Sequence, residues 1–196
     1  MSHHIYQTEG FIIGSMPVNE ASRYISIFTE DLGLIRGLAQ GVRNNRSKLR
    51  YSLQDLSYSK VSFVRGREIW RIVNAEKMSL LENSILNNEK KVFIAKTAAF
   101  LKRFIVGDIK DSQLFTEIKN GFQFLNNETL TSEDLIRVEL MFVLRILKHL
   151  GYGPMEKDFD SILFFLEWDR SALCFIENKK DKVLSAIRHA IAQSHL

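Results

Sequence analysis

Cationic side chains gather in one short stretch of this chain, and cations without neighbouring acids are suited to binding an anion. No acidic residue occurs between Asp31 and Asp55. The basic residues of this interval are Arg36, Arg43, Arg46, Lys48 and Arg50. Gly37, Gly41 and the pair Asn44-Asn45 favour a loop over a helix. Such a loop is suited to a phosphate backbone, although a solvated basic loop without any partner would have the same composition.

The charge of the whole chain is distributed unevenly. Residues 1–77 hold 11 Lys and Arg against 7 Asp and Glu, whereas residues 78–196 hold 16 of each kind. The net charge of +4 therefore lies entirely in the first part, which indicates an anion-binding module followed by a neutral second part. Arg65 and Arg67 form a second cationic turn, and the sequence alone does not place it relative to the first loop.

Aromatic residues accompany the basic stretch and could stack on nucleic-acid bases where they are exposed. Phe63 and Trp70 are expected in a hydrophobic core. Tyr51 follows Lys48 in a polar stretch and is the better candidate for stacking.

The chain shows no set of residues with the spacing of a catalytic or metal site. It has no P-loop, no G-x-G-x-x-G, no G-x-S-x-G and no H-E-x-x-H. Its one cysteine, Cys174, excludes a disulfide or a thiolate zinc site within the chain, and its apolar neighbours predict a buried thiol. We therefore expect no enzyme activity, no cofactor and no metal. A small hydrolase, whose catalytic residues would come together only in the folded chain, is an alternative that ranks below the two interpretations given at the end of this section.

The pattern along the chain predicts strands first and helices afterwards. Short β-rich runs occur at 5–14, 23–29, 34–40, 56–64 and 68–74, and polar and apolar residues alternate in 23–29. Gly10 is a candidate bulge within the first of them. Five strands in this space predict a small barrel of the OB-like kind, which often binds single-stranded nucleic acid.

Helical signals dominate the remainder of the chain. We expect helices over 89–106, 114–125, 131–150 and 183–193, whereas 158–178 is ambiguous between strand and buried helix. In the first of these helices Val92, Ala95, Ala99, Leu101 and Phe104 are expected to face the core. The predicted fold is of the α+β class, with an OB-like DNA-binding barrel at 1–77 and a helical domain at 78–196.

The start of the chain and its hydropathy suggest a protein that is not bound to a membrane. The N-terminal residues lack the apolar segment of a signal peptide, and no apolar run approaches the length of a membrane span. We expect a cytoplasmic protein.

Several short motifs, in order and spacing, resemble the RecO family of recombination mediators. They are Thr8-Glu9-Gly10, Asn19-Glu20-Ala21, Phe28-Thr29, Gly33-Leu34-Ile35, Gly41-Val42-Arg43, Ser47-x-Leu49-Arg50 and Arg65-Gly66-Arg67-Glu68. Leu150-Gly151-Tyr152-Gly153-Pro154 is similar to the LGYxP signature of that family. The resemblance is dense over 5–77, patchy over 78–154 and weak afterwards.

The resemblance implies an OB fold followed by a helical domain, with no known catalytic residues. It implies binding of single- and double-stranded DNA, annealing of complementary strands, and cooperation with RecR and the single-stranded DNA-binding protein in loading the recombinase RecA. A protein with these DNA-binding roles would be associated with the nucleoid in the cytoplasm.

Two positions depart from the family pattern. Many members carry a four-cysteine zinc module after LGYxP, whereas this sequence has only Cys174 there, so we expect a short variant without it. Gln40 stands where a basic residue is common.

We therefore predict a DNA-binding repair mediator. Phosphate contacts are assigned to Arg36, Arg43, Arg46, Lys48 and Arg50, with Arg65 and Arg67 in second rank. The alternative is a protein–protein adaptor that binds no DNA and whose basic loop docks an acidic peptide, such as the acidic tail of the single-stranded DNA-binding protein.

Overall fold

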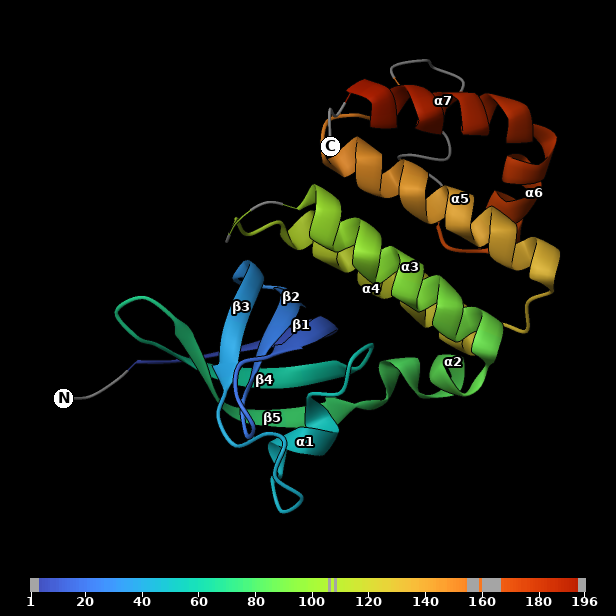
Figure 1. Cartoon of the computed structure of the whole chain (residues 1–196). Helices are drawn as coiled ribbons and strands as arrows, with labels where there is room; N and C mark the ends of the chain where they lie inside the picture. The colour runs from blue at the N-terminus through green and yellow to red at the C-terminus, as the bar shows by residue number, and fades with distance from the viewer. Residues whose placement is uncertain (1–3, 106, 108, 155–158, 160–166, 194–196) are drawn as a thin grey trace.

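A closed β-barrel forms the first part of the chain and helices form the rest, as predicted. The computed structural model describes residues 4–105, 107, 109–154, 159 and 167–193. The strands are β1 (Ile5–Pro17), β2 (Arg23–Thr29), β3 (Gly33–Ala39), β4 (Tyr58–Arg65) and β5 (Trp70–Met78). They close in the order β1-β2-β3-β5-β4, with β3 and β5 parallel and the other neighbours antiparallel. The α+β class and the OB-like barrel are confirmed (Figure 1).

Alternation along each strand fills the barrel. Inward-facing residues are almost all apolar and include Ile12, Ile25, Ile27, Ile35, Val61, Phe63, Trp70 and Ile72. Phe63 and Trp70 are buried, which confirms their prediction as core residues. β-branched and aromatic side chains suit this arrangement because they pack well on a pleated, buried surface.

The bulge in β1 falls at a different glycine from the one expected. The register of β1 against β2 shifts between Ile12 and Gly14, while Gly10 pairs regularly with Thr29. A larger residue would not fit in place of Gly10, because a Cβ there would lie 2.6 Å from a methyl group of Ile27. Gly14 has φ +154°, which accommodates the bulge.

The basic stretch is a loop only in part. Arg36 lies within β3, and the chain then turns through residues 40–48 into the short helix α1 (Leu49–Ser52). Leu53 is buried and Leu49 packs against the barrel core, so this helix covers one end of the barrel. The strand expected at 34–40 is confirmed as β3, and glycine and asparagine content predicted the turns, but the short helix α1 was not expected.

The second part is helical throughout its described residues. After the single 3-10 turn η1 (Ser79–Leu81), the helices are α2 (Glu82–Leu86), α3 (Asn88–Phe104), α4 (Ser112–Asn127), α5 (Ser132–His149), α6 (Arg170–Asn178) and α7 (Lys180–Gln193). Asn87, Asp111 and Thr131 accept hydrogen bonds at the starts of α3, α4 and α5. The ambiguous segment 158–178 is helical from Arg170, whereas residues 158 and 160–166 lie outside the described part.

The face that helix α3 presents to the core agrees only in part with the one expected. Phe93, Ile94, Thr97 and Ala98 are buried with Leu101 and Phe104, whereas Val92, Ala95 and Ala99 are exposed. Leu101 and Phe104 are thus buried as expected, and the other three expected residues are exposed because apolar side chains occur on both sides of this stripe. Cys174 is likewise exposed and not buried, because Ala172, Leu173 and Ile176 of α6 face the core instead.

Helices α3 and α4 pack directly on the barrel (Figure 1). Phe11, Phe28 and Tyr58 face out of the barrel and join Phe115 and Phe122 of α4 in one hydrophobic cluster. The predicted boundary at residue 77 stays a prediction, and β5 ends at Met78. In the described part of the chain, no helix has the length and hydropathy needed to cross a bilayer.

Candidate nucleic-acid interface

All seven predicted cations are exposed on the barrel part, and none of them forms an ion pair with a described residue. They are Arg36, Arg43, Arg46, Lys48, Arg50, Arg65 and Arg67. The cations of the ion pairs that the described residues form all lie from Lys96 onward, in the helical part. The excess charge found in the sequence is therefore available at the surface of the barrel.

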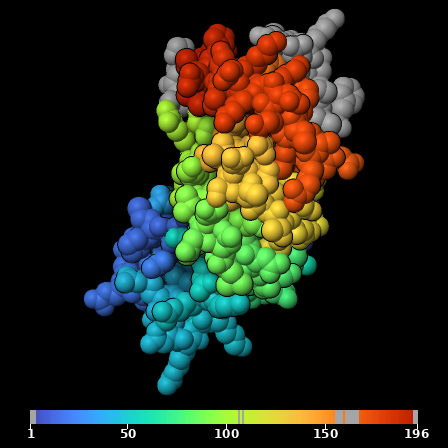
Figure 2. Space-filling model, turned by 90° about the vertical axis from the view of Figure 1, so that its right-hand side faces the viewer, coloured from blue at the N-terminus to red at the C-terminus, as the bar shows by residue number. Residues whose placement is uncertain are grey.

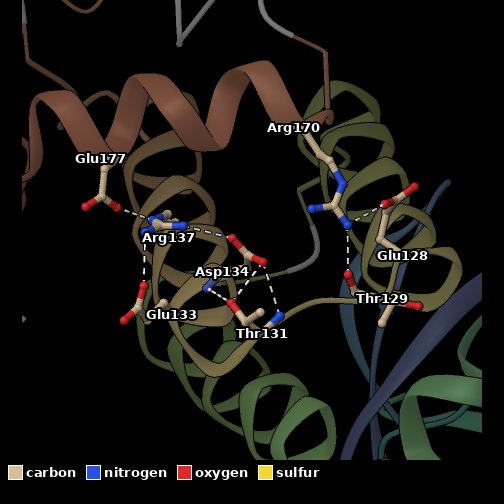
Figure 3. Close-up of polar contacts among 8 residues, drawn as sticks. All are labelled: Glu128, Thr129, Thr131, Glu133, Asp134, Arg137, Arg170 and Glu177. Atoms are coloured by element: carbon tan, nitrogen blue, oxygen red, sulfur yellow. Dashed lines mark hydrogen bonds and ion pairs between the residues drawn. The ribbon is translucent and has the colours of Figure 1, made fainter.

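The helical part uses its cations internally, as Figure 3 shows. Arg137 of α5 contacts Glu133, Asp134 and Glu177. A hydrogen bond from the Thr131 backbone, with help from Arg137, lowers the pKa of the Asp134 carboxyl. Arg170 pairs with Glu128 at 3.3 Å. These arginines hold helices together and are not free to attract a phosphate.

A hollow of about 410 Å³ lies beside the turn that follows β3. Arg23, Arg43 and Arg50 line it, with Val42, Leu53, Gln54 and Asp55. The Arg43 amide donates to the Ala21 carbonyl at 3.0 Å and its guanidinium to the Asn19 carbonyl at 2.9 Å, which anchors the turn to the β1–β2 connection. Figure 2 shows side chains of this cyan segment projecting from the end of the molecule farthest from the red helices.

Arg36 occupies a separate position on the outer face of β3. Its guanidinium carbon lies 4.5 Å from the centre of the Tyr24 ring, and one of its nitrogens lies 3.7 Å from the Met16 sulfur. Exposed stacking of this kind holds an arginine extended over the sheet.

Arg23 is a functional candidate that sequence reasoning missed. It donates to the Ser15 hydroxyl at 3.1 Å and also lines the hollow with Arg43 and Arg50. The pairing of β2 with β3 is what brings Arg23 to this place, because Arg23 pairs with Ala39, the last residue of β3 before the basic turn. The sequence places Arg23 in an alternating strand but does not show that this strand lies beside the basic turn.

Arg65 and Arg67 lie at the turn between β4 and β5. Arg65 covers the Trp70 ring at 5.2 Å, and Trp70 pairs with Gly37 of β3. This turn and the turn after β3 leave the barrel in different directions (Figure 1). The structure therefore does not bring Arg65 and Arg67 together with Arg43 and Arg50.

The remaining predicted residues are exposed without a fixed partner. The Arg46 and Lys48 side chains form no hydrogen bond with any described residue, and both sit in the turn after β3. Tyr51, the stacking candidate, is 60% exposed, with the Lys77 ammonium 4.4 Å from its ring centre.

Two acidic residues of the barrel bind the helical part. Glu9 accepts hydrogen bonds from Lys119, at 2.7 Å, and from the Tyr58 hydroxyl. The Lys119 hydrogen bond is the main cause of a lowered Glu9 pKa, and burial raises the pKa of Tyr58. Asp31 pairs with Lys110 at 3.0 Å, which lowers the pKa of Asp31. Glu9 and Asp31 are thus directed towards the helices, whereas Asp55 lies in the hollow beside Arg43 and Arg50.

Among the residues that the structure describes, no group of three or more His, Cys, Asp or Glu is placed to hold a metal ion.

Comparisons with known proteins place the chain in a family. Residues 1–80 match the family model described as "Recombination protein O N terminal". Proteins named "DNA repair protein RecO" are similar over most of the chain. The chain belongs to the RecO family.

RecO relatives from three bacteria give the extent of the likeness. The protein from Clostridium perfringens is 25% identical over 82% of this chain and 63% of its own length. Those from Shigella flexneri and Escherichia coli O139:H28 are each 32% identical over 73% of this chain and 57% of their own length. The chain therefore spans about three fifths of the curated RecO proteins it matches. The predicted resemblance is confirmed.

Proposed function

We propose that this RecO-family chain takes part in DNA repair as a mediator that binds DNA through its barrel. The observation that carries the proposal is the separation of charge: the barrel keeps its cations exposed and without ion pairs among the described residues, while the cations of the ion pairs that these residues form all belong to the helical part. A polyanion is the partner that such a surface attracts.

Phosphate contacts would come from Arg36, Arg43, Arg46, Lys48 and Arg50, with Arg23 added to them. Such contacts position a strand and read little of its sequence. Binding without sequence preference suits the annealing of any complementary pair. Cations that screen two phosphate backbones at once would lower the repulsion between the strands.

The proposal extends to partners that the resemblance implies. RecR and the single-stranded DNA-binding protein would bind the same assembly, and together they would help to load RecA on single strands. Both single- and double-stranded DNA would be ligands. No step of this function breaks or forms a covalent bond, so the proposed role is that of a mediator and not of an enzyme. Its proposed location is the cytoplasm, in association with the nucleoid.

The first experiment measures binding of labelled single strands of different sequence by fluorescence anisotropy. The double variant Arg43→Glu, Arg46→Glu should weaken binding by at least about 25-fold at about 0.1 M salt, because two contacts are lost and reversed in sign. All sequences should be affected equally. The matched control is Arg137→Glu in the helical part, scored only after its folding has been checked by circular dichroism. A loss confined to one sequence would argue for base readout instead.

The second experiment separates mediator from adaptor. The chain is mixed with complementary strands coated by the single-stranded DNA-binding protein, and annealing is followed by fluorescence quenching. Faster annealing by the wild type, lost in the double variant, supports the mediator. The hollow lined by Arg43 and Arg50 over Val42 and Leu53 could instead take an acidic peptide. An adaptor of that kind would bind the peptide and leave naked DNA unbound.

A further inference from the structure

One cation of the helical part lies on the barrel surface itself. A Cβ built on Gly14 of β1 would lie 2.0 Å from the ammonium nitrogen of Lys102, in the last turn of α3. The ammonium thus occupies the space that a side chain of residue 14 would take. Lys102 is exposed and forms no ion pair with a described residue.

Two further cations reach the same short segment of β1 from other strands. Arg23 of β2 donates to the hydroxyl of Ser15, and Arg36 of β3 places its guanidinium against the sulfur of Met16. Positions 14 and 16 lie on one face of the strand, roughly 7 Å apart. Lys102 and Arg36 therefore approach β1 on its outer face, at positions 14 and 16. Ser15 and Arg23 lie on the opposite face, since Ser15 pairs with the buried Ile25.

The outer face between these cations is neutral and open. Gly14 pairs with Ser26, and Ser26 pairs with Arg36, so a half-buried serine lies between the two cations across the sheet. Met16 is 52% exposed. A cluster of like charges without an acid is unfavourable by itself, and it becomes favourable when an anion binds between its members.

We propose that Lys102 and Arg36 form a phosphate seat on the outer face of β1, and that nucleic acid crosses the junction of barrel and helices there. The inference rests on the proposed DNA binding and deepens it, because it extends the path of the strand from the turn after β3 to the end of α3. Arg23 reaches the same segment of β1 from the opposite face, where it lines the hollow with Arg43 and Arg50.

A structural role for Lys102 is the competing explanation. A lysine in the last turn of a helix interacts favourably with the helix dipole, and it would be there without any ligand. The two roles differ in their consequences. Loss of a dipole interaction lowers the stability of the fold, whereas loss of a phosphate contact lowers the salt dependence of DNA binding.

The test compares Lys102→Ala with Lys96→Ala, a lysine of the same helix that is paired with Glu139 at 2.9 Å. For single-stranded DNA, Lys102→Ala should reduce the slope of log affinity against log salt by about 0.7, which corresponds to about five-fold weaker binding at about 0.1 M salt. Lys96→Ala should leave the slope unchanged, and Lys102→Arg should restore it. Wild-type binding with a steep slope, unchanged in Lys102→Ala, would overturn the phosphate seat and leave the proposed DNA binding intact.

A second measurement locates the ligand and identifies its source. Amide resonances of Gly14 and Ser26 are followed by nuclear magnetic resonance during titration with an oligothymidylate strand, and separately with inorganic phosphate at equal ionic strength. Shifts with the oligonucleotide at stoichiometric concentration, absent in Lys102→Ala, support a nucleic-acid phosphate. Shifts with inorganic phosphate alone would show a site for a free anion and overturn the proposal. Absence of any DNA binding by the wild type would instead refute the proposed function.

Discussion

The guanidinium carbon of Arg36 lies 4.5 Å above the centre of the Tyr24 ring, on the outer face of neighbouring strands. This contact holds a cation extended over the sheet and leaves it exposed to solvent. The barrel therefore presents Arg36 at a fixed place before any ligand arrives. Preorganisation of this kind reduces the entropy lost on binding.

Arg36→Ala should weaken single-stranded DNA binding by about five-fold at about 0.1 M salt and lower the salt slope by about 0.7. Arg170→Ala is the matched control, because Arg170 is equally an exposed arginine but is paired with Glu128. Titrations by fluorescence anisotropy at several salt concentrations give both quantities. Equal effects of the two substitutions would contradict a special role for Arg36.

The contact of Glu9 with Lys119 predicts a dependence of stability on pH. Because the pKa of folded Glu9 lies below its usual value of 4.5, the contact stabilises the fold fully above that pH and is lost as the pH falls through the folded-state pKa. Glu9→Gln should lower the free energy of unfolding by about 1–2 kcal/mol at neutral pH and by less in acid. Urea unfolding at pH values above and below 4.5 measures this. Glu20→Gln, an exposed carboxyl in the β1–β2 turn, serves as the control, and a parallel pH profile for both variants would refute the assignment.

Gly33 joins the barrel to the segment between α3 and α4. It has φ +69°, and a Cβ there would lie 2.4 Å from the Ile109 carbonyl oxygen. Gly33→Ala should lower the free energy of unfolding by about 2–3 kcal/mol, since it adds a backbone clash to the strain of a positive φ. Gly151 has φ +84°, and a Cβ there would have no atom within 4 Å. Gly151→Ala should therefore lower the free energy of unfolding by about 1 kcal/mol, from backbone strain alone. Thermal or urea unfolding measures both losses of stability. Equal losses for the two variants would show that the contact with residue 109 does not destabilise Gly33→Ala.

The exposure of Cys174 predicts its reactivity. The thiol lies on the outer side of α6, so Ellman's reagent should modify it in the native protein at a rate comparable with that in denaturant. Absorbance of the released thiolate measures the rate. A thiol that reacts only after unfolding would instead fit the burial expected from the sequence.

Local patterns of the sequence were sufficient for the barrel and the helices. Alternation in Arg23–Thr29 predicted β2 with its observed bounds, and the helix expected over 131–150 is α5, which Thr131 caps. The charge split located the basic surface. These features depend on residues close in sequence, where period and composition determine the outcome.

Features that depend on pairing of distant segments were not accessible from the sequence. Arg23 reaches the basic turn only because β2 pairs with β3, and Lys102 reaches β1 only because α3 packs on the barrel. The face of α3 was misjudged because exposed apolar residues such as Val92 lie beside the buried ones. Cys174 has apolar neighbours in sequence, but in a helix its neighbours point in other directions.

The central claim is that the barrel binds phosphates through its unpaired cations. The most direct test is the salt dependence of wild-type affinity for single-stranded DNA. If Arg23, Arg36, Arg43, Arg46, Lys48 and Arg50 each contact one phosphate, log affinity should fall with log salt with a slope of roughly −4.2. A slope near zero, or no binding to naked DNA at low salt, would contradict the claim.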